Sequence, residues 1–232
     1  LPLVGIRPLL ATFAVVIGLS TAFSPALLAQ KGKENEEAKR VAEATTVFTE
    51  VMGAEDKAIP KTILDKAEAI AIFPGTIKAG LGVGGLRGRG VISARGANGW
   101  SSPAFLTITG GSIGLQIGGK VSEIVFIILT DKGLEAILKN KFKFGAEAGV
   151  TMVAVGIGME GASTSAVGAD IIAYSASAGL FAGASIEGSY LDADNDWNAL
   201  YYGPGANTRS IVIDRKFTNP GAEPLRQFLA KW

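Results

Sequence analysis

The chain has no cysteine and no histidine among its 232 residues. Without cysteine it can form no disulfide, carry no thiol nucleophile and accept no lipid on a lipoprotein-type cysteine. Without histidine, Ser-His-Asp and Cys-His nucleophiles and the usual nitrogen and sulfur zinc sites are excluded. Only carboxylate, Lys and Tyr chemistry remains, and no cluster of these residues stands out. We therefore expect no catalytic turnover. We also expect no cofactor, no metal and no nucleic-acid partner.

Charged residues are also few, at 19%, whereas 48% of the residues are hydrophobic, which argues for one folded domain rather than disorder. Residues 57–143 hold twelve Lys and Arg against five acids, and residues 144–208 hold seven acids and no base. This segregation predicts a molecule with one basic face, which would steer it towards anionic partners. The alternative is that neighbouring strands mix the two blocks once the sheet forms.

The N-terminal residues have the pattern of a secretory leader. An apolar stretch at residues 9–23 follows Arg7 and precedes small residues up to Ala29. We predict a signal peptide at residues 1–29, cleaved after Ala29, and one domain at residues 30–232. An uncleaved anchor is the alternative, although the apolar stretch is shorter than the about 20 residues that a membrane span needs. In both cases the domain is expected to be exported, as a periplasmic or secreted protein that can associate peripherally with a membrane.

Glycine is abundant where one would expect strands. Fourteen of the 31 glycines lie in residues 73–119. Glycine is retained inside strands mainly for bulges, bends or the close approach of another backbone or a ligand. Strand alternation puts Gly88 and Gly90 on one face and Arg87, Arg89 and Arg95 on the other. This pattern predicts a sheet with one bare face and one basic face.

The periodicity of the remaining segments predicts an α+β fold, with a strongly curved, mostly antiparallel, Gly-rich sheet that is barrel- or sandwich-like. Helical spacing of apolar residues predicts an amphipathic helix at residues 36–52, a short helix from Pro60 to Glu68, a central helix at 131–138 that is capped by Asp131, and a C-terminal helix that ends near Trp232. Residues 121–130 are expected to form a buried central strand, and residues 142–190 several long antiparallel strands.

Ordered motifs run along most of the chain. They are Ile59-Pro60, Ile63-Leu64, Ala71-Ile72-Phe73-Pro74, Lys78-Ala79-Gly80, Gly84-Gly85, Gly88, Gly90, Arg95, Gly99-Trp100-Ser101, Pro103, Gly111-Ser112, Gly114, Gln116, Gly118, Tyr174-Ser175, Gly179-Leu180, Ala182-Gly183, Ser185, Glu187-Gly188 and Tyr201-Tyr202-Gly203. In this order they resemble the SYLF domain, over roughly residues 36–230. The resemblance implies a non-enzymatic phospholipid-binding module, with phosphoinositides and actin as partners of eukaryotic members.

The basic residues of the Gly-rich region are the candidate site. We predict that Lys78, Arg87, Arg89 and Arg95, with Lys120 as a weaker candidate, contact an anionic phospholipid or membrane surface. The competing hypothesis is that these arginines pair with the acids of residues 144–208.

Two other classes of protein remain as alternatives. An outer-membrane β-barrel or envelope structural protein would fit export and Gly-rich strands, but the last segment has helical periodicity. A hydrolase would have to use Lys120 with Ser122 or Asp170 with Glu187, and no spacing joins these residues into a site.

Several short motifs are weaker still. Two G-x-G-x-x-G matches begin at Gly80 and Gly156. A dinucleotide site requires that such a loop opens a helix, and we expect no helix after either match. The acidic run that ends at Asp196 is expected to form a capped turn leading into residues 197–202 rather than a calcium loop.

Overall fold

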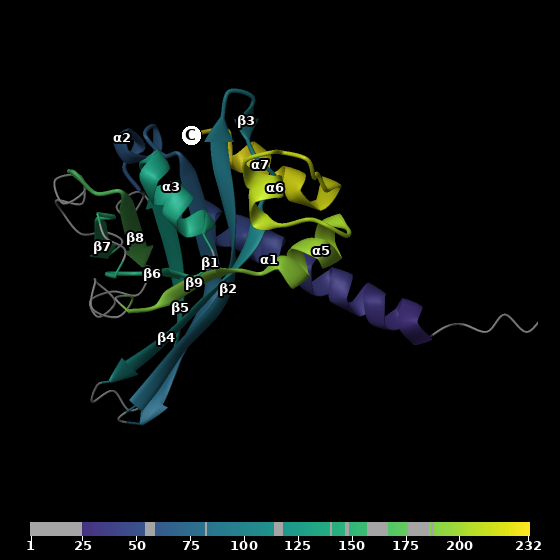
Figure 1. Cartoon of the computed structure of the whole chain (residues 1–232), viewed down its shortest axis with the longest axis horizontal. Helices are drawn as coiled ribbons and strands as arrows, with labels where there is room; N and C mark the ends of the chain where they lie inside the picture. Colours follow the sequence, from purple (N-terminus) through teal and green to yellow (C-terminus); the bar gives the residue numbers. More distant parts are fainter. Residues whose placement is uncertain are drawn as a thin grey trace, which may run out of the picture.

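The computed structural model describes residues 25–53, 59–81, 83–113, 118–139, 141–146, 149–156, 167–175, 186 and 188–232. The described strands form one curved sheet with helices on both faces (Figure 1). The architecture is α+β and mostly antiparallel, with N-terminal, central and C-terminal helices, which confirms the predicted fold class.

Four long strands form the centre of the sheet. They are β1 (Ala69–Leu81), β2 (Val83–Gly96), β4 (Ala104–Ile113) and β5 (Gly118–Ile128). The strand order is β6-β9-β4-β2-β1-β5-β8-β7, and β3 (Gly99–Trp100) pairs with the end of β2. Ile124 to Ile128 of β5 are buried between β1 and β8, as the continuous apolar run predicts.

The strands of residues 142–190 differ from expectation. β6 (Phe142–Lys143), β7 (Met152–Gly156), β8 (Ile171–Ser175) and β9 (Tyr190–Ala193) have only two to five residues each. β7 also pairs with β8 in parallel. The prediction of antiparallel strands is therefore wrong for the pair β7 and β8, and the described parts of these four strands are short. Alternation of side chains reports which face of a sheet is buried, and it carries no information about strand direction.

Each face of the sheet packs on its own helices. The first face, called the α1 face, carries α1 (Pro25–Gly53), α2 (Lys61–Leu64), α5 (Asn195–Tyr202) and α7 (Glu223–Leu229). The second face, called the α3 face, carries α3 (Asp131–Leu138) and α6 (Thr208–Val212). A 3-10 turn (Pro220–Ala222) leads into α7.

Helix α1 packs on the core along the predicted stripe. Val41, Ala44, Phe48 and Val51 are all buried, and Phe48 meets Phe228 of α7 edge to face at 5.9 Å. The helix begins at Pro25, earlier than expected, so it includes the predicted cleavage point; residues 1–24 of the predicted leader lie outside the described residues. Within the described part of the chain, no helix combines the length and the apolar character needed to span a membrane.

Two predicted helix boundaries are wrong. Helix α3 is capped by Thr130, whose hydroxyl accepts a hydrogen bond from the Gly133 N–H, so Asp131 is already inside the helix. Helix α2 ends at Leu64 rather than at Glu68. Glu68 belongs to the sheet instead, because its N–H donates to the Ile128 carbonyl and its own carbonyl accepts from the Arg95 N–H.

A bulge in β1 explains two of the glycines. The register of β1 shifts between Phe73 and Thr76 against β5, and the bulged backbone approaches β2. A Cβ atom on Gly90 would lie 2.4 Å from the Ile72 carbonyl oxygen, and one on Gly88 would lie 2.7 Å from the Thr76 hydroxyl. The predicted close approach of another backbone is thus confirmed at this face. Beyond the bulge the far ends of β1, β2 and β4 project past the helices (Figure 1).

Candidate functional site

The three arginines of β2 all belong to the α1 face, but only Arg87 is free. Its side chain is exposed, and the described residues offer it no hydrogen bond or ion pair. It lies opposite Ile77 of β1 and Thr109 of β4, on the projecting part of the sheet. An unpaired guanidinium at this position is available to an external anion.

Arg89 has partners inside the protein. Its Nε donates to Asp194 Oδ2 at 2.8 Å, and its guanidinium lies 4.2 Å from the centroid of the Trp197 ring. Asp194 is also the N-cap of α5, because its other carboxylate oxygen accepts from the Trp197 N–H. Arg89 therefore ties α5 to β2. This is the ion pair between the basic and the acidic block that the competing hypothesis predicts.

Arg95 is also engaged in internal contacts. Its guanidinium donates to the carbonyls of Leu64 and Ala67 at 2.8 and 3.0 Å, and it stacks over the Trp100 ring at 4.7 Å. A longer hydrogen bond of 3.5 Å reaches the carbonyl of Trp232. Five donors in a fixed fork suit such a junction of several segments. In this structure Arg95 joins α2, β2 and the C-terminal segment.

The two predicted lysines lie opposite each other in the β1–β5 ladder. Lys78 pairs in register with Lys120, one position beyond the pair Ile77 and Val121. Their side chains lie outside the described part of the structure.

Six described side chains form a continuous line across the α1 face of the projecting strands. Each pair of neighbours is directly opposite in register, so the side chains share one face. We call this line the Arg87 row, and in strand order it consists of Lys143 (β6), Tyr190 (β9), Thr109 (β4), Arg87 (β2), Ile77 (β1) and Val121 (β5). The row has two halves. The polar half, from Lys143 to Arg87, carries two cations and two hydroxyl groups, whereas the aliphatic half consists of Ile77 and Val121.

The aliphatic half is unusually exposed for its residue type. Ile77 is 54% exposed and Val121 is 64% exposed, although both are β-branched residues in the middle of long strands. Next to them a groove of about 570 Å³ separates β1 and β5 from α1, with Glu43, Glu50 and Glu123 among its lining residues. Burial, together with the nearby Glu50, raises the pKa of the Glu123 carboxyl.

The polar half borders a shallow hollow of about 360 Å³. Arg87, Thr109 and Tyr190 line it, together with Leu86, Gly110 and Gly111. Lys143 extends the row on the far side, with its Nζ 5.3 Å from the centroid of the Tyr190 ring.

Each of the two candidate hydrolase pairs has one member outside the described residues, namely the Lys120 side chain and Glu187. Ser122 is buried on β5, whereas Asp170 lies beside Leu129 at the other end of that strand, about 20 Å away at about 3.4 Å per residue. Asp170 is already engaged by the Thr130 hydroxyl, the Thr151 N–H and the Lys132 amine. Glu187 lies outside the described residues.

The remaining motifs form no ligand site in the described part of the chain. There, no group of three acidic, His or Cys residues is placed to hold a metal ion. The acidic run is a capped turn before α5, as predicted. Gly80 lies in β1 and opens no helix.

The sequence of residues 109–232 matches the family described as "Ysc84: Las17-binding protein actin regulator". The match covers more than half of the chain and includes β5, all later elements and the Thr109, Lys143 and Tyr190 positions of the row. The chain belongs to the Ysc84 family. The resemblance to the SYLF domain is thereby confirmed.

Relatives within the Ysc84 family are similar over most of this chain. Protein YSC84 of Saccharomyces cerevisiae is 31% identical over 84% of this chain and 42% of its own length. LAS seventeen-binding protein 3 of the same yeast is 31% identical over 84% of this chain and 43% of its own length. The human SH3 domain-containing YSC84-like protein 1 is 36% identical over 83% and 57%. The chain thus spans about half the length of these curated relatives.

Sequence reasoning located Arg87 but missed the other five members of the row. Alternation within the strand placed Arg87 on a face, but Lys143 and Tyr190 come from strands that follow about 55 to 100 residues later. A clue was present in the sequence, because Ile77 and Val121 are β-branched residues in a glycine-rich context.

Proposed function

We propose that this member of the Ysc84 family is a non-enzymatic module that binds anionic phospholipid membranes through the Arg87 row. The observation that carries the proposal is an unpaired, exposed guanidinium directly beside exposed aliphatic side chains on strands that project from the body. Basic side chains near an anionic membrane contribute about 1 kcal/mol each. Aliphatic and tyrosine side chains add affinity at the boundary between head groups and acyl chains.

Non-enzymatic binding is supported by the same geometry. Histidine and cysteine are absent, and the described Ser122 and Asp170 are buried. The names of the relatives also describe binding proteins, which include a Las17-binding protein and an actin regulator.

The test is flotation of the protein with vesicles of phosphatidylcholine and phosphatidylserine. Arg87→Glu changes the local charge by two units, so binding should weaken at least about tenfold. Arg209→Glu is the matched control, because it makes the same change of net charge on α6, at the α3 face. Binding of the wild type should also weaken from 0.1 M to 1 M salt, as the Debye length falls from about 10 Å to about 3 Å. If both variants lose vesicle binding equally, net charge alone explains the loss, which contradicts the proposal.

A protein partner is the second candidate, because the family description names Las17 binding and actin regulation. Co-sedimentation with actin filaments separates the two functions. If Arg87→Glu abolishes filament binding while vesicle binding persists, the row serves a protein partner rather than a membrane.

A further inference from the structure

The polar half of the Arg87 row has the composition of a phosphate site. It joins one guanidinium, one ammonium and two hydroxyl groups from four neighbouring strands, namely Arg87, Lys143, Thr109 and Tyr190. Directly opposite residues on adjacent strands have Cβ atoms about 4.5–5.5 Å apart, so consecutive members of this set can contact the same small ligand.

The polar groups of this set have no competing partners among the described residues. Neither the Arg87 guanidinium nor the hydroxyls of Thr109 and Tyr190 take part in a hydrogen bond or an ion pair there. The contact recorded for the Lys143 amine is with the face of the Tyr190 ring. By contrast, Arg89, one row further into the body, is neutralised by Asp194.

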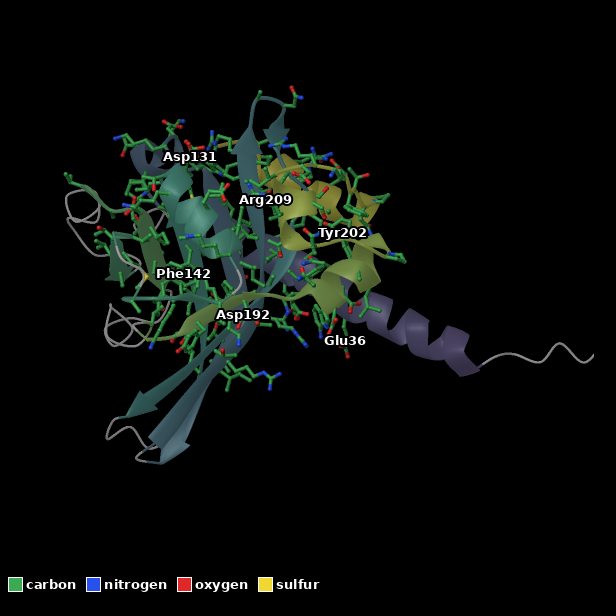
Figure 2. The ribbon with its side chains drawn as sticks, in the orientation of Figure 1. Glu36, Asp131, Phe142, Asp192, Tyr202 and Arg209 are labelled. Atoms are coloured by element: carbon green, nitrogen blue, oxygen red, sulfur yellow. The ribbon has the colours of Figure 1, made fainter. Side chains whose placement is uncertain are left out.

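The local charge favours a doubly charged anion. Two cations lie at the ends of the set and the hydroxyls lie between them, beside the 360 Å³ hollow floored by Gly110 and Gly111. A phosphate monoester carries about −1.5 to −2 charges at pH 7 and presents three acceptor oxygens, whereas a phosphodiester carries one charge. Arg can bind two of these oxygens at once, and hydroxyl groups can donate to the third. Asp192 of β9, labelled in Figure 2, is two residues from Tyr190 and lies opposite Thr107, so it is an acid on this face one row from the set.

We propose that Arg87, Thr109, Tyr190 and Lys143 bind a phosphate monoester group. The proposal rests on the proposed membrane function in so far as the group belongs to a lipid head group, with Ile77 and Val121 lying against the same membrane surface. A soluble phosphate monoester offers the same chemistry, and the experiment separates the two sources.

The experiment uses the full chain and two kinds of vesicle with equal surface charge, one containing phosphatidic acid and one containing phosphatidylserine. The wild type should bind the phosphatidic acid vesicles about fivefold more tightly, the effect of about one extra charge interaction. Thr109→Val and Tyr190→Phe change no charge, and each should remove this preference, so that the variant binds the two kinds of vesicle with equal affinity. Thr107→Val is the matched control, because Thr107 lies one row further back, opposite Arg89, and should keep the preference. Asp192→Asn should strengthen binding to both vesicles.

Each outcome decides between the two proposals. Equal binding to both vesicles, or a preference that survives in Thr109→Val and Tyr190→Phe, overturns the phosphate site and leaves membrane binding intact. No binding to either vesicle overturns the membrane function. In that case a thermal shift with inorganic phosphate that is lost in Thr109→Val supports the site with a soluble ligand, and no shift overturns it as well.

Discussion

Arg87, Arg89 and Arg95 share one strand and one face, but their surroundings give them different roles. Arg89 neutralises the Asp194 carboxylate. Arg95 donates hydrogen bonds to the carbonyls of Leu64 and Ala67. Arg87, further along β2, has no such group as a partner among the described residues. The distance of an arginine from the body of the protein therefore decides whether it stabilises the fold or remains available to a ligand.

This difference predicts that substitutions of Arg89 and Arg87 change the free energy of unfolding by different amounts. Arg89→Ala should lower the free energy of unfolding by about 1–2 kcal/mol, because it leaves the nearly buried Asp194 carboxylate without its cation and removes the contact with Trp197. Arg87→Ala should stay within about 0.5 kcal/mol of the wild type. Urea unfolding measures both values. Similar losses in the two variants would show that Arg87 has a structural partner after all.

At the scale of elements, the bulge of β1 makes some glycines of β2 much less tolerant of a side chain than others. We expect Gly90→Ala to destabilise the protein by more than about 2 kcal/mol, since the new methyl group would overlap the Ile72 carbonyl and the Phe73 ring. Gly85→Ala is the control, because the nearest atom would be 3.9 Å away and the cost should stay below about 1 kcal/mol. Thermal melts of both variants test the difference. A stable Gly90→Ala protein would mean that the bulge relaxes without cost.

A second element-scale prediction concerns Asp170, which joins the start of α3 to the segment before β8. Burial alone would raise the pKa of the Asp170 carboxyl, but hydrogen bonds from Thr151, Thr130 and Lys132 outweigh burial and lower this pKa. The carboxylate therefore contributes stability above its unfolded pKa of about 3.9, and this contribution is lost as the pH falls through the lower folded value.

Asp170→Asn should accordingly lower the free energy of unfolding by about 1–3 kcal/mol at pH 7, and this loss should become smaller as the pH falls below about 4. Urea unfolding of both proteins between pH 3 and pH 7 provides the comparison. A cost that does not change with pH would show that the carboxylate is not held in its charged form by these contacts.

The sequence predicts elements better than the arrangement of elements. The helix at residues 36–52 and the strand at residues 121–130 follow from local periodicity, and the structure confirms the helix and a strand that is buried at Ile124 to Ile128. The parallel pairing of β7 with β8 and the position of β9 beside β4 depend on contacts between distant segments, which periodicity does not encode. The Arg87 row needs the register of five strand pairs, so one residue of it could be predicted and five could not.

At the scale of the whole molecule, the two charge blocks of the sequence are partly interleaved. Arg89 pairs with Asp194, and Lys132 pairs with Asp170, so each of these ion pairs joins the basic block to the acidic block. The predicted basic face is thereby reduced to the projecting strands, where Arg87 has no such partner.

Export remains a prediction for the whole chain. N-terminal sequencing of secreted protein should begin at Gln30 or within a few residues of it, because the leader pattern ends at Ala29. A chain that begins at Gln30 should keep the melting temperature of the full chain, since the buried side chains described in α1 extend from Glu37 to Val51. Intact residues 9–23 in a washed membrane fraction would instead indicate an uncleaved anchor.

The order of the strands in the sheet also determines when the proposed site forms during folding. Arg87 and Thr109 meet through a short connection, whereas β9 pairs with β4 across about 80 residues of chain and β6 pairs with β9 across about 50. Contacts of such long sequence separation form late during folding. β6 is a two-residue strand at the outer end of the sheet, so fraying there would leave Arg87, Thr109 and Tyr190 without Lys143. A bound phosphate group would slow hydrogen exchange at this edge first, which makes the sheet edge itself a reporter of ligand occupancy.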